Sequence, residues 1–263
     1  MSVADECAAW RAGTLDTWSD PNERRFHDSA PGGFTSQARQ DRLLWDALFS
    51  KLNRTGRYID CAANHYKRIS NTYFYDRCAS WHGLCVEPNP IYHEGLRSQR
   101  TCRLAPTCMS DDPSKEVDML LPPYQWLGGM GGIGNGTVES LIRRPTGAII
   151  RRAPLWSFYP PRKWKRTRMH CSTLADEVRQ LAWAQVDFLS LDVEGHEASV
   201  LRGIDWQRVR IDYILCERNC DAELRPRGYR PQPLPPPPGK PKGDELLWVR
   251  EGLPKVRWRG TVV

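Results

Sequence analysis

The stretch VDFLSLDVEG, residues 186–195, is a nearly continuous run of apolar side chains that ends in two acids, Asp192 and Glu194. A run of this kind is typical of a strand that is covered on both faces in a parallel sheet. In open α/β sheets, ligands bind just beyond the carboxyl ends of the strands. The sequence therefore predicts that a rigid strand holds Asp192 at a ligand-binding edge.

Glu194 has a second interpretation, because it stands just before a helix predicted at 196–203. Acidic side chains favour the first turn of a helix, where they interact with the helix dipole. This interpretation suits Glu194 and Glu197 better than it suits Asp192. We therefore expect a functional role for Asp192 above all.

The bulk composition is that of a globular protein. The chain has 263 residues, of which 40% are hydrophobic and 26% charged, enough for one α/β domain with extensions. No apolar run approaches the roughly 20 residues that a membrane span needs. The first residues, MSVADECAAW, lack the basic start and apolar stretch of a signal peptide, which favours a cytoplasmic location.

The nine cysteines are scattered along the chain and form no CxxC pair or zinc-like cluster with histidine. Several fall in predicted strands, where a small buried thiol is the usual interpretation. The odd count argues against a complete disulfide framework. A bridge between Cys102 and Cys108 is left as an alternative.

Positive charge is concentrated in one segment. Residues 143–168 contain nine of the 38 Lys and Arg residues and none of the 31 acids. Aromatic residues, among them Trp156 and Tyr159, stand between the basic ones, and such a mixture can bind phosphates and stack on bases or sugars. A solvated insertion explains the same composition equally well.

Strand-like and helix-like segments alternate on both sides of this insertion. We expect strands at 57–62, 83–87, 102–109, 186–195, 211–217 and 245–250, and helices at 36–52, 71–80, 92–99, 174–184 and 196–203. The alternation predicts an α/β domain with a parallel sheet.

The alternation and the composition between its segments also predict how the chain is organised. The domain covers residues 34–250, with an irregular basic insertion at 110–170 and a proline-rich loop at 231–243. Residues 1–33 are expected to be a loosely ordered extension, and 251–263 a C-terminal tail.

Three expected strands carry an acid at or near their carboxyl ends, namely Asp60, Glu87 and Asp192, and Glu217 is a fourth. Parallel strands bring these ends to one edge of the sheet, so the first three acids are expected to line one crevice. A carboxylate after the second strand suits a ribose, because it accepts hydrogen bonds from both hydroxyls of a cis-diol. Either a dinucleotide or an adenosyl cofactor fits this arrangement.

Five segments occur in a particular order and spacing: SQARQD (36–41), YIDCAAN with SNT (58–72), GLCVEPNP (83–90), VDFLSLDVEGHE (186–197) and IDYILCERN (211–219). Together they resemble the FkbM-type methyltransferases. The resemblance covers about residues 33–250. Its most specific part is VDFLSLDVEGHE followed by VLRGIDW (200–206).

The resemblance implies a class I methyltransferase fold. This Rossmann-like fold has a mostly parallel seven-stranded sheet with helices on both faces and an antiparallel last strand. It also implies binding of S-adenosylmethionine and O-methylation of a small molecule or a sugar.

The resemblance assigns six residues to the cofactor. They are Asp60, Ala62 and Asn64 in the first loop, Glu87 on the ribose, and Ser110 and Asp111 near the adenine. Asp192 would face the methyl-transfer site, as the carboxylate that positions the acceptor or takes its proton, with Glu194 or His196 as partners. His196 is of a type that can act as a general base, although a surface or capping role explains it equally well.

The first cofactor loop departs from the family pattern D-x-G-A-N-x-G, because Ala62 and Tyr66 replace its two glycines. Alanine substitutes at little cost where φ is negative. The Tyr66 ring stands where a ligand or helix is expected to come close, unless it points away. These replacements support a rival hypothesis, a catalytically inactive member that keeps the fold as a binding or trafficking module.

A third hypothesis, a nucleic-acid methyltransferase, rests on residues 143–168 alone and predicts steeply salt-dependent binding. We assign no metal ligand from the sequence, although a divalent ion held by Asp192 and a neighbouring acid is compatible with it. The expected partner is a small-molecule or carbohydrate acceptor.

Overall fold

The structure is a computed structural model that describes residues 3–12, 35–36, 39–114, 116–121, 132–133, 165–217, 219–236 and 245–258. Its main sheet is formed by seven strands. They are β1 (Arg57–Cys61), β2 (His82–Val86), β3 (Arg103–Ala105), β7 (Gln185–Leu191), β8 (Arg210–Cys216), β9 (Tyr229–Pro233) and β10 (Leu246–Arg250).

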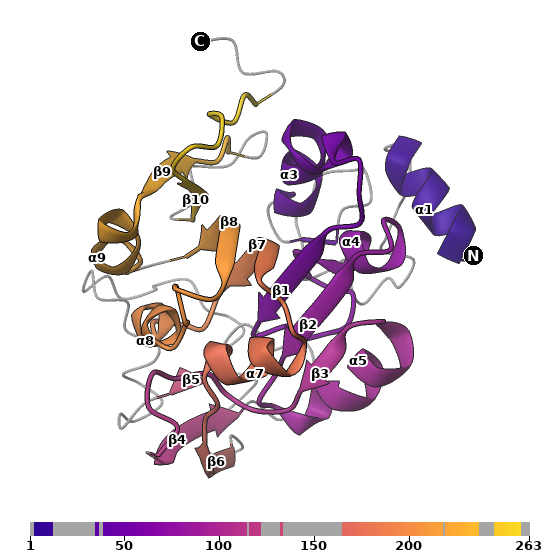
Figure 1. The fold of residues 1–263 in the computed structure, drawn as a ribbon. Coiled ribbons are helices and arrows are strands. Elements are labelled where there is room, and N and C mark those ends of the chain that lie inside the picture. Colours follow the sequence, from indigo (N-terminus) through magenta and orange to yellow (C-terminus); the bar gives the residue numbers. More distant parts are fainter. Residues whose placement is uncertain are drawn as a thin grey trace, which may run out of the picture.

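The strand order in the sheet is β3-β2-β1-β7-β8-β10-β9 (Figure 1). The first five strands in this order are parallel, and β10 runs antiparallel to both of its neighbours. The predicted α/β fold, with a mostly parallel seven-stranded sheet and an antiparallel last strand, is therefore confirmed.

Helices cover both faces of this sheet (Figure 1). One face packs against α7 (Leu174–Gln180), α8 (Glu197–Arg202) and α9 (Asp221–Leu224), which is followed by η5 (Arg225–Arg227). The other face packs against α3 (Gln40–Ala47), η1 (Phe49–Lys51), α4 (Tyr73–Arg77), η2 (Pro90–Tyr92) and α5 (His93–Gln99). Successive residues of a strand enter opposite cores, as Phe188 and Leu189 of β7 do.

The expectation of an irregular segment at 110–170 is wrong for the part that the structure describes. Strands β4 (Glu116–Leu121), β5 (Gly132–Ile133) and β6 (Lys165–His170) form a separate antiparallel sheet in the order β5-β4-β6. The sequence KRTRMH of β6 lacks apolar alternation, and its arginines instead lie near the acids Glu116 and Asp118 of β4. Residues 134–164, which hold most of the basic segment, lie outside the described residues.

The proline-rich loop expected at 231–243 begins as a strand. In β9, Pro231 pairs with Trp248 and Pro233 pairs with Leu246 of β10. Proline removes an N–H donor, but β9 lies at the edge of the sheet and needs donors on one side only. The prolines that argued against a strand are therefore compatible with this edge position.

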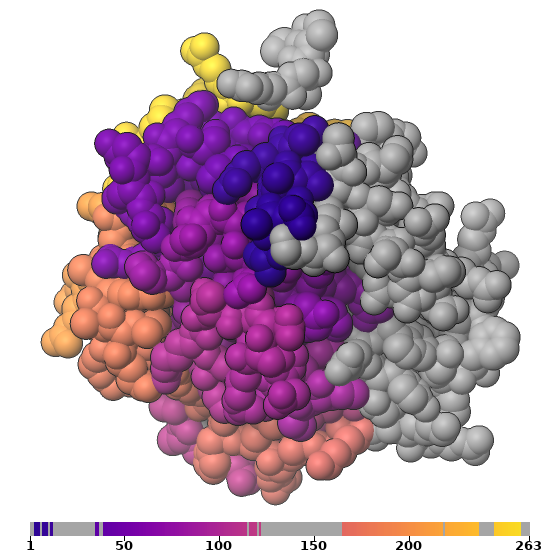
Figure 2. All heavy atoms as spheres, turned by 90° about the vertical axis from the view of Figure 1, so that its right-hand side faces the viewer, coloured from indigo at the N-terminus to yellow at the C-terminus, as the bar shows by residue number. Residues whose placement is uncertain are grey.

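The expectation of loose order at 1–33 is wrong for residues 3–12, which form α1 (Val3–Ala12). Figure 2 shows α1, in indigo, on the surface of the molecule beside residues from the first part of the chain. A disulfide joins its Cys7 to Cys78, and Arg11 donates a hydrogen bond to the carbonyl of Cys78 at 2.6 Å. These contacts hold α1 against the end of α4, although the sequence of residues 3–12 alone does not predict an ordered segment.

Eight of the nine cysteines form disulfides, so the interpretation of the strand cysteines as buried thiols is wrong for Cys85 and Cys216. The pairs are Cys7–Cys78, Cys85–Cys102, Cys108–Cys171 and Cys216–Cys220. The remaining thiol, Cys61, is buried. Cys102 therefore pairs with Cys85 and not with Cys108. None of the helices in the described part of the chain is long and apolar enough to cross a membrane.

Candidate functional site

Strand register defines the carboxyl edge of the sheet. Cys61 at the end of β1 pairs with Val86 of β2 on one side and with Leu191 of β7 on the other. Leu191 in turn pairs with Cys216 of β8. The next residues of these four strands therefore lie side by side at one edge: Ala62, Glu87, Asp192 and Glu217.

Glu87 links the first two strands of this edge. Its carboxylate is buried and accepts hydrogen bonds from the backbone N–H of Asn64 at 2.8 Å and of Asn89 at 2.7 Å. Burial raises the pKa of Glu87 to about 7, although both hydrogen bonds oppose the shift. Each carboxylate oxygen has a further lone pair, so Glu87 retains the capacity to accept hydrogen bonds from a ligand.

The first loop has an unusual backbone. Ala62 has a φ of 62° and Asn64 a φ of 60°, so the condition of negative φ expected for Ala62 is not met. Asparagine tolerates this left-handed region, whereas alanine occupies it at a cost of about 1–2 kcal/mol. The Oδ1 atom of Asn64 is buried and has no hydrogen-bond partner among the described residues.

The Tyr66 ring is used in packing. It stacks on His65 at a centroid distance of 4.3 Å and lies against Gly95 of α5. A Cβ atom at Gly95 would approach Tyr66 Cδ1 to 2.9 Å, closer than side chains tolerate. The large residue at position 66 is thus accommodated by a glycine on the neighbouring helix.

A buried arginine supports the first loop from beneath. Arg100 donates hydrogen bonds to the Tyr66 carbonyl at 3.0 Å and to Thr72 Oγ1 at 2.7 Å. Thr72 Oγ1 in turn donates to Asp60 Oδ2 at 2.5 Å. Burial raises the pKa of Asp60, and the positive charge of Arg100 opposes this shift. The structure thus places Asp60 in an internal hydrogen-bond network below the loop.

Ser110 and Asp111 are connected to α8. Asp111 accepts hydrogen bonds from Ser199 Oγ at 2.6 Å and from Arg202 Nε at 2.8 Å, and these contacts lower its pKa. Ser110 Oγ lies 3.4 Å from Ser199 Oγ. The carboxylate of Asp111 is therefore engaged by α8, and its role near an adenine stays a prediction.

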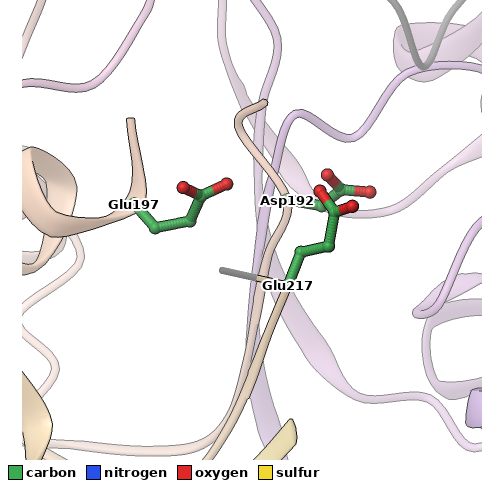
Figure 3. Close-up of side chains that lie close together, drawn as sticks. All are labelled: Asp192, Glu197 and Glu217. Atoms are coloured by element: carbon green, nitrogen blue, oxygen red, sulfur yellow. The ribbon is translucent and has the colours of Figure 1, made fainter. Parts of the chain in front are cut away.

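Three carboxylates converge where β7 and β8 end. Asp192, Glu197 and Glu217 each offer an oxygen atom, and these three atoms lie within 4.8 Å of one another (Figure 3). Burial raises the pKa of Asp192 well above its ordinary value, and the charge of Glu217 adds to the shift. The edge formed by these strand ends thus includes a cluster of three carboxyl groups.

A tight turn positions this cluster. The N–H of His196 donates to the carbonyl of Val193 at 3.4 Å, and the two residues between them, Glu194 and Gly195, have φ values of 55° and 100°. Glu197 Oε1 accepts hydrogen bonds from the N–H groups of Val193 at 3.3 Å and Gly195 at 3.0 Å. The carboxylate of Glu197 therefore fastens the turn to the first residue of α8.

His196 is not one of the three clustered residues. It occupies the N-cap position of α8, but its side chain forms no capping hydrogen bond. Burial lowers its pKa, with Asp111 opposing the shift and Arg202 adding to it. The charges of Asp111 and Arg202 act on the His196 ring, and the catalytic roles expected for Glu194 and His196 stay predictions.

Sequence reasoning did not select Glu197 as a site residue, because an acid in the first turn of a helix has an ordinary explanation. Glu217 was recognised as a strand-terminal acid but not grouped with Asp192. The available signal was the pair of adjacent parallel strands, each followed at once by an acid, with a third acid five residues after Asp192.

The family model of the methyltransferase FkbM domain matches residues 60–224. The matched region runs from the end of β1 to the end of α9 and contains the whole carboxyl edge described above, together with the acid cluster. No curated protein and no solved structure matches the chain.

Proposed function

Because the chain belongs to the FkbM methyltransferase family, we propose that it transfers the methyl group of S-adenosylmethionine to an oxygen atom of a small molecule or carbohydrate. The observation that carries the proposal is the register at the carboxyl edge. It sets Glu87 on one side of the Ala62–Asn64 loop and Asp192 on the other. Strands are spaced about 4.8 Å apart, so these two acids are separated by about 10 Å.

This separation leaves room for a cofactor whose ribose lies at Glu87 and whose methyl group lies toward Asp192. Glu87 would accept hydrogen bonds from the ribose hydroxyls, and Asn64 Oδ1 offers a further buried acceptor close by. Ser110 and Asp111 would lie toward the adenine. Asp60 would act through Thr72 and Arg100, by holding the loop, and not by contact with the ligand.

Methyl transfer from a sulfonium requires an acceptor oxygen that is aligned with the methyl group and loses its proton. Asp192 lies at the edge where such an acceptor would stand and is the residue proposed to position it or to take the proton. Glu194 and His196 flank it as secondary candidates. The acceptor hydroxyl would approach from beyond the strand ends.

Calorimetric titration with S-adenosylmethionine and S-adenosylhomocysteine tests the cofactor site. We expect wild-type protein to bind both, Glu87→Ala to bind at least tenfold more weakly, and Asp192→Asn to bind normally but to lose turnover. Glu94→Gln, an exposed acid on α5, is the matched control. Absence of binding to wild-type protein would contradict the proposal.

The rival function, a binding or trafficking module without catalysis, is favoured by one observation. Ala62 adopts a left-handed conformation where the family pattern has glycine. Wild-type protein that binds no cofactor in the titration above would support this alternative.

The nucleic-acid hypothesis has less support from the described part of the basic segment. Arg166 and Arg168 lie within 3.5–3.7 Å of the acids Asp118 and Glu116, which reduces the charge available to phosphates.

The disulfides bear on where the protein acts. Disulfides form and persist in oxidising compartments and are rare in the cytosol. Four of them, joining segments that are 4 to 71 residues apart, favour folding in an oxidising compartment over the expected cytoplasmic location.

A further inference from the structure

We propose that Asp192, Glu197 and Glu217 form a binding site for a divalent cation of the Mg²⁺, Mn²⁺ or Ca²⁺ type. The three carboxylates offer oxygen atoms that lie within 4.8 Å of one another. Oxygen ligands on opposite sides of such an ion are about 4–5 Å apart. The spacing is therefore that of ligands around one ion, and the site goes beyond the proposed methyl transfer.

Glu197 supplies an independent indication of a ligand. Its side chain is completely buried, with 0% of its surface exposed. Oε1 accepts two backbone hydrogen bonds, but Oε2 is buried without a hydrogen-bond partner in the described part of the chain. Figure 3 shows this carboxylate directed toward Asp192 and Glu217. A buried carboxylate oxygen without a partner is costly, and a bound cation would satisfy it.

Asp192 shows the same feature. Its Oδ1 atom is also buried without a hydrogen-bond partner among the described residues. No Lys or Arg of the described chain forms an ion pair with Asp192 or Glu197.

Two other buried acids of this fold have a counter-charge, whereas Asp41 and Glu87 are compensated by neutral hydrogen-bond donors. Asp76 pairs with Arg100 at 2.8 Å, and Asp187 pairs with Arg54. Asp192 Oδ1 and Glu197 Oε2 have neither kind of compensation in the described part of the chain, and a divalent ion would supply it.

The ligand chemistry indicates the class of ion. All three donors are carboxylates, which suit hard cations, and no histidine or cysteine ligand is included that would favour zinc or copper. Cys216, next to Glu217, forms a disulfide with Cys220 and therefore offers no thiolate ligand.

The donors are held by separate and well-fixed parts of the fold. Asp192 directly follows β7, Glu217 directly follows β8 within the loop closed by the Cys216–Cys220 disulfide, and Glu197 opens α8. Ligands on rigid elements give a preorganised site. If the proposed methyl transfer is correct, an acceptor hydroxyl bound to this cation would lose its proton more readily.

Titration of the full-length protein with Mn²⁺, followed by the electron paramagnetic resonance signal of free Mn²⁺, tests the site. We expect saturable binding of one ion per chain that Mg²⁺ or Ca²⁺ displaces. Asp192→Asn, Glu197→Gln and Glu217→Gln should each weaken binding about tenfold or more. Glu94→Gln should bind as wild type does. No cofactor is needed, so this result is independent of the S-adenosylmethionine titration.

Thermal unfolding separates loss of the site from loss of the fold. Mn²⁺ should raise the melting temperature of wild-type protein but not that of Glu197→Gln. Without Mn²⁺, the variant should melt at the same temperature as wild type or higher, because one of three clustered charges is removed. Wild-type protein that takes up no Mn²⁺ at about 1 mM, or a Glu197→Gln variant that binds it equally well, would overturn the proposal.

Discussion

Glu87 combines complete burial with a carboxylate that is held by the backbone N–H groups of Asn64 and Asn89. Its pKa of about 7 lies above the ordinary value of 4.5, so the folded protein holds this proton more tightly than the unfolded chain does. Stability therefore falls as the pH rises from 4.5 to about 7, by about 3 kcal/mol from this residue alone.

Glu87→Gln should remove this dependence. The amide cannot ionise, so the variant should not lose stability as the pH rises. Its free energy of unfolding minus that of wild type should therefore be larger at pH 8 than at pH 4.5. The constant cost of placing an NH₂ group against a backbone N–H donor is the same at both pH values and cancels in the comparison. Urea unfolding at the two pH values measures the difference, with Glu94→Gln as control, and an equal difference at both would contradict the assignment.

At the residue level, the sequence indicated the positions of the strand-terminal acids but not their environments. Asp192 could be found because it ends a buried apolar strand. Glu197 could not, because its burial depends on the turn at 193–196 and on tertiary packing. The backbone of Ala62 and the packing of Tyr66 against Gly95 likewise depend on contacts with other elements.

Among the elements, α8 and the loop after β3 form one packed unit. A Cβ atom at Gly203, the C-cap residue of α8, would lie 2.5 Å from the carbonyl oxygen of Ser110. The φ of Gly203 is −76°, so alanine is sterically excluded by this contact and not by its own backbone. The glycine of the VLRGIDW segment thus allows the close approach that brings Asp111 to Ser199.

Gly203→Ala should destabilise the protein by about 1–3 kcal/mol, since either backbone must move to relieve the contact. The movement should also weaken the hydrogen bond from the Asp111 N–H to Ser199 Oγ, which is 3.2 Å long. Chemical unfolding measures the first effect and amide hydrogen exchange at Asp111 the second. Ser98→Ala on an exposed turn of α5 serves as the control. Unchanged exchange at Asp111 would refute the expected coupling.

The elements that could be predicted are those whose own residues form a regular apolar pattern, independent of contacts with other elements. The five parallel strands and the helices between them follow from hydrophobic runs. The strands expected at 83–87 and 211–217 begin and end one residue earlier, and several helices are shorter than expected, such as the helix expected at 36–52 that is observed as α3 and η1. Strand β9 was missed because its prolines are tolerated only at an edge. Strands β4 and β6 were missed because KRTRMH of β6 lacks apolar alternation. The two strands are joined by backbone pairing, by a small apolar cluster around the Cys108–Cys171 disulfide, and by exposed ion pairs.

For the whole molecule, the disulfides connect parts of the chain that the α/β pattern alone leaves separate. Cys7–Cys78 attaches α1 to the domain, Cys85–Cys102 links β2 to the start of β3, and Cys108–Cys171 closes the base of the inserted sheet. Cysteine pairing depends on tertiary proximity, which is why spacing in the sequence did not reveal it.

Thiol titration checks this framework as a whole. Native protein purified without reductant should show no reactive thiol, because Cys61 is only 1% exposed. In denaturant one thiol should react, and after reduction all nine should react. Reduction should also lower the midpoint of unfolding, since losing a native disulfide typically costs about 2–5 kcal/mol. A Cys61→Ser variant with no reactive thiol in denaturant would identify Cys61 as the single free cysteine. Several reactive thiols in unreduced wild-type protein would show that the cross-links do not form, and would remove the support that the disulfides give to an oxidising compartment.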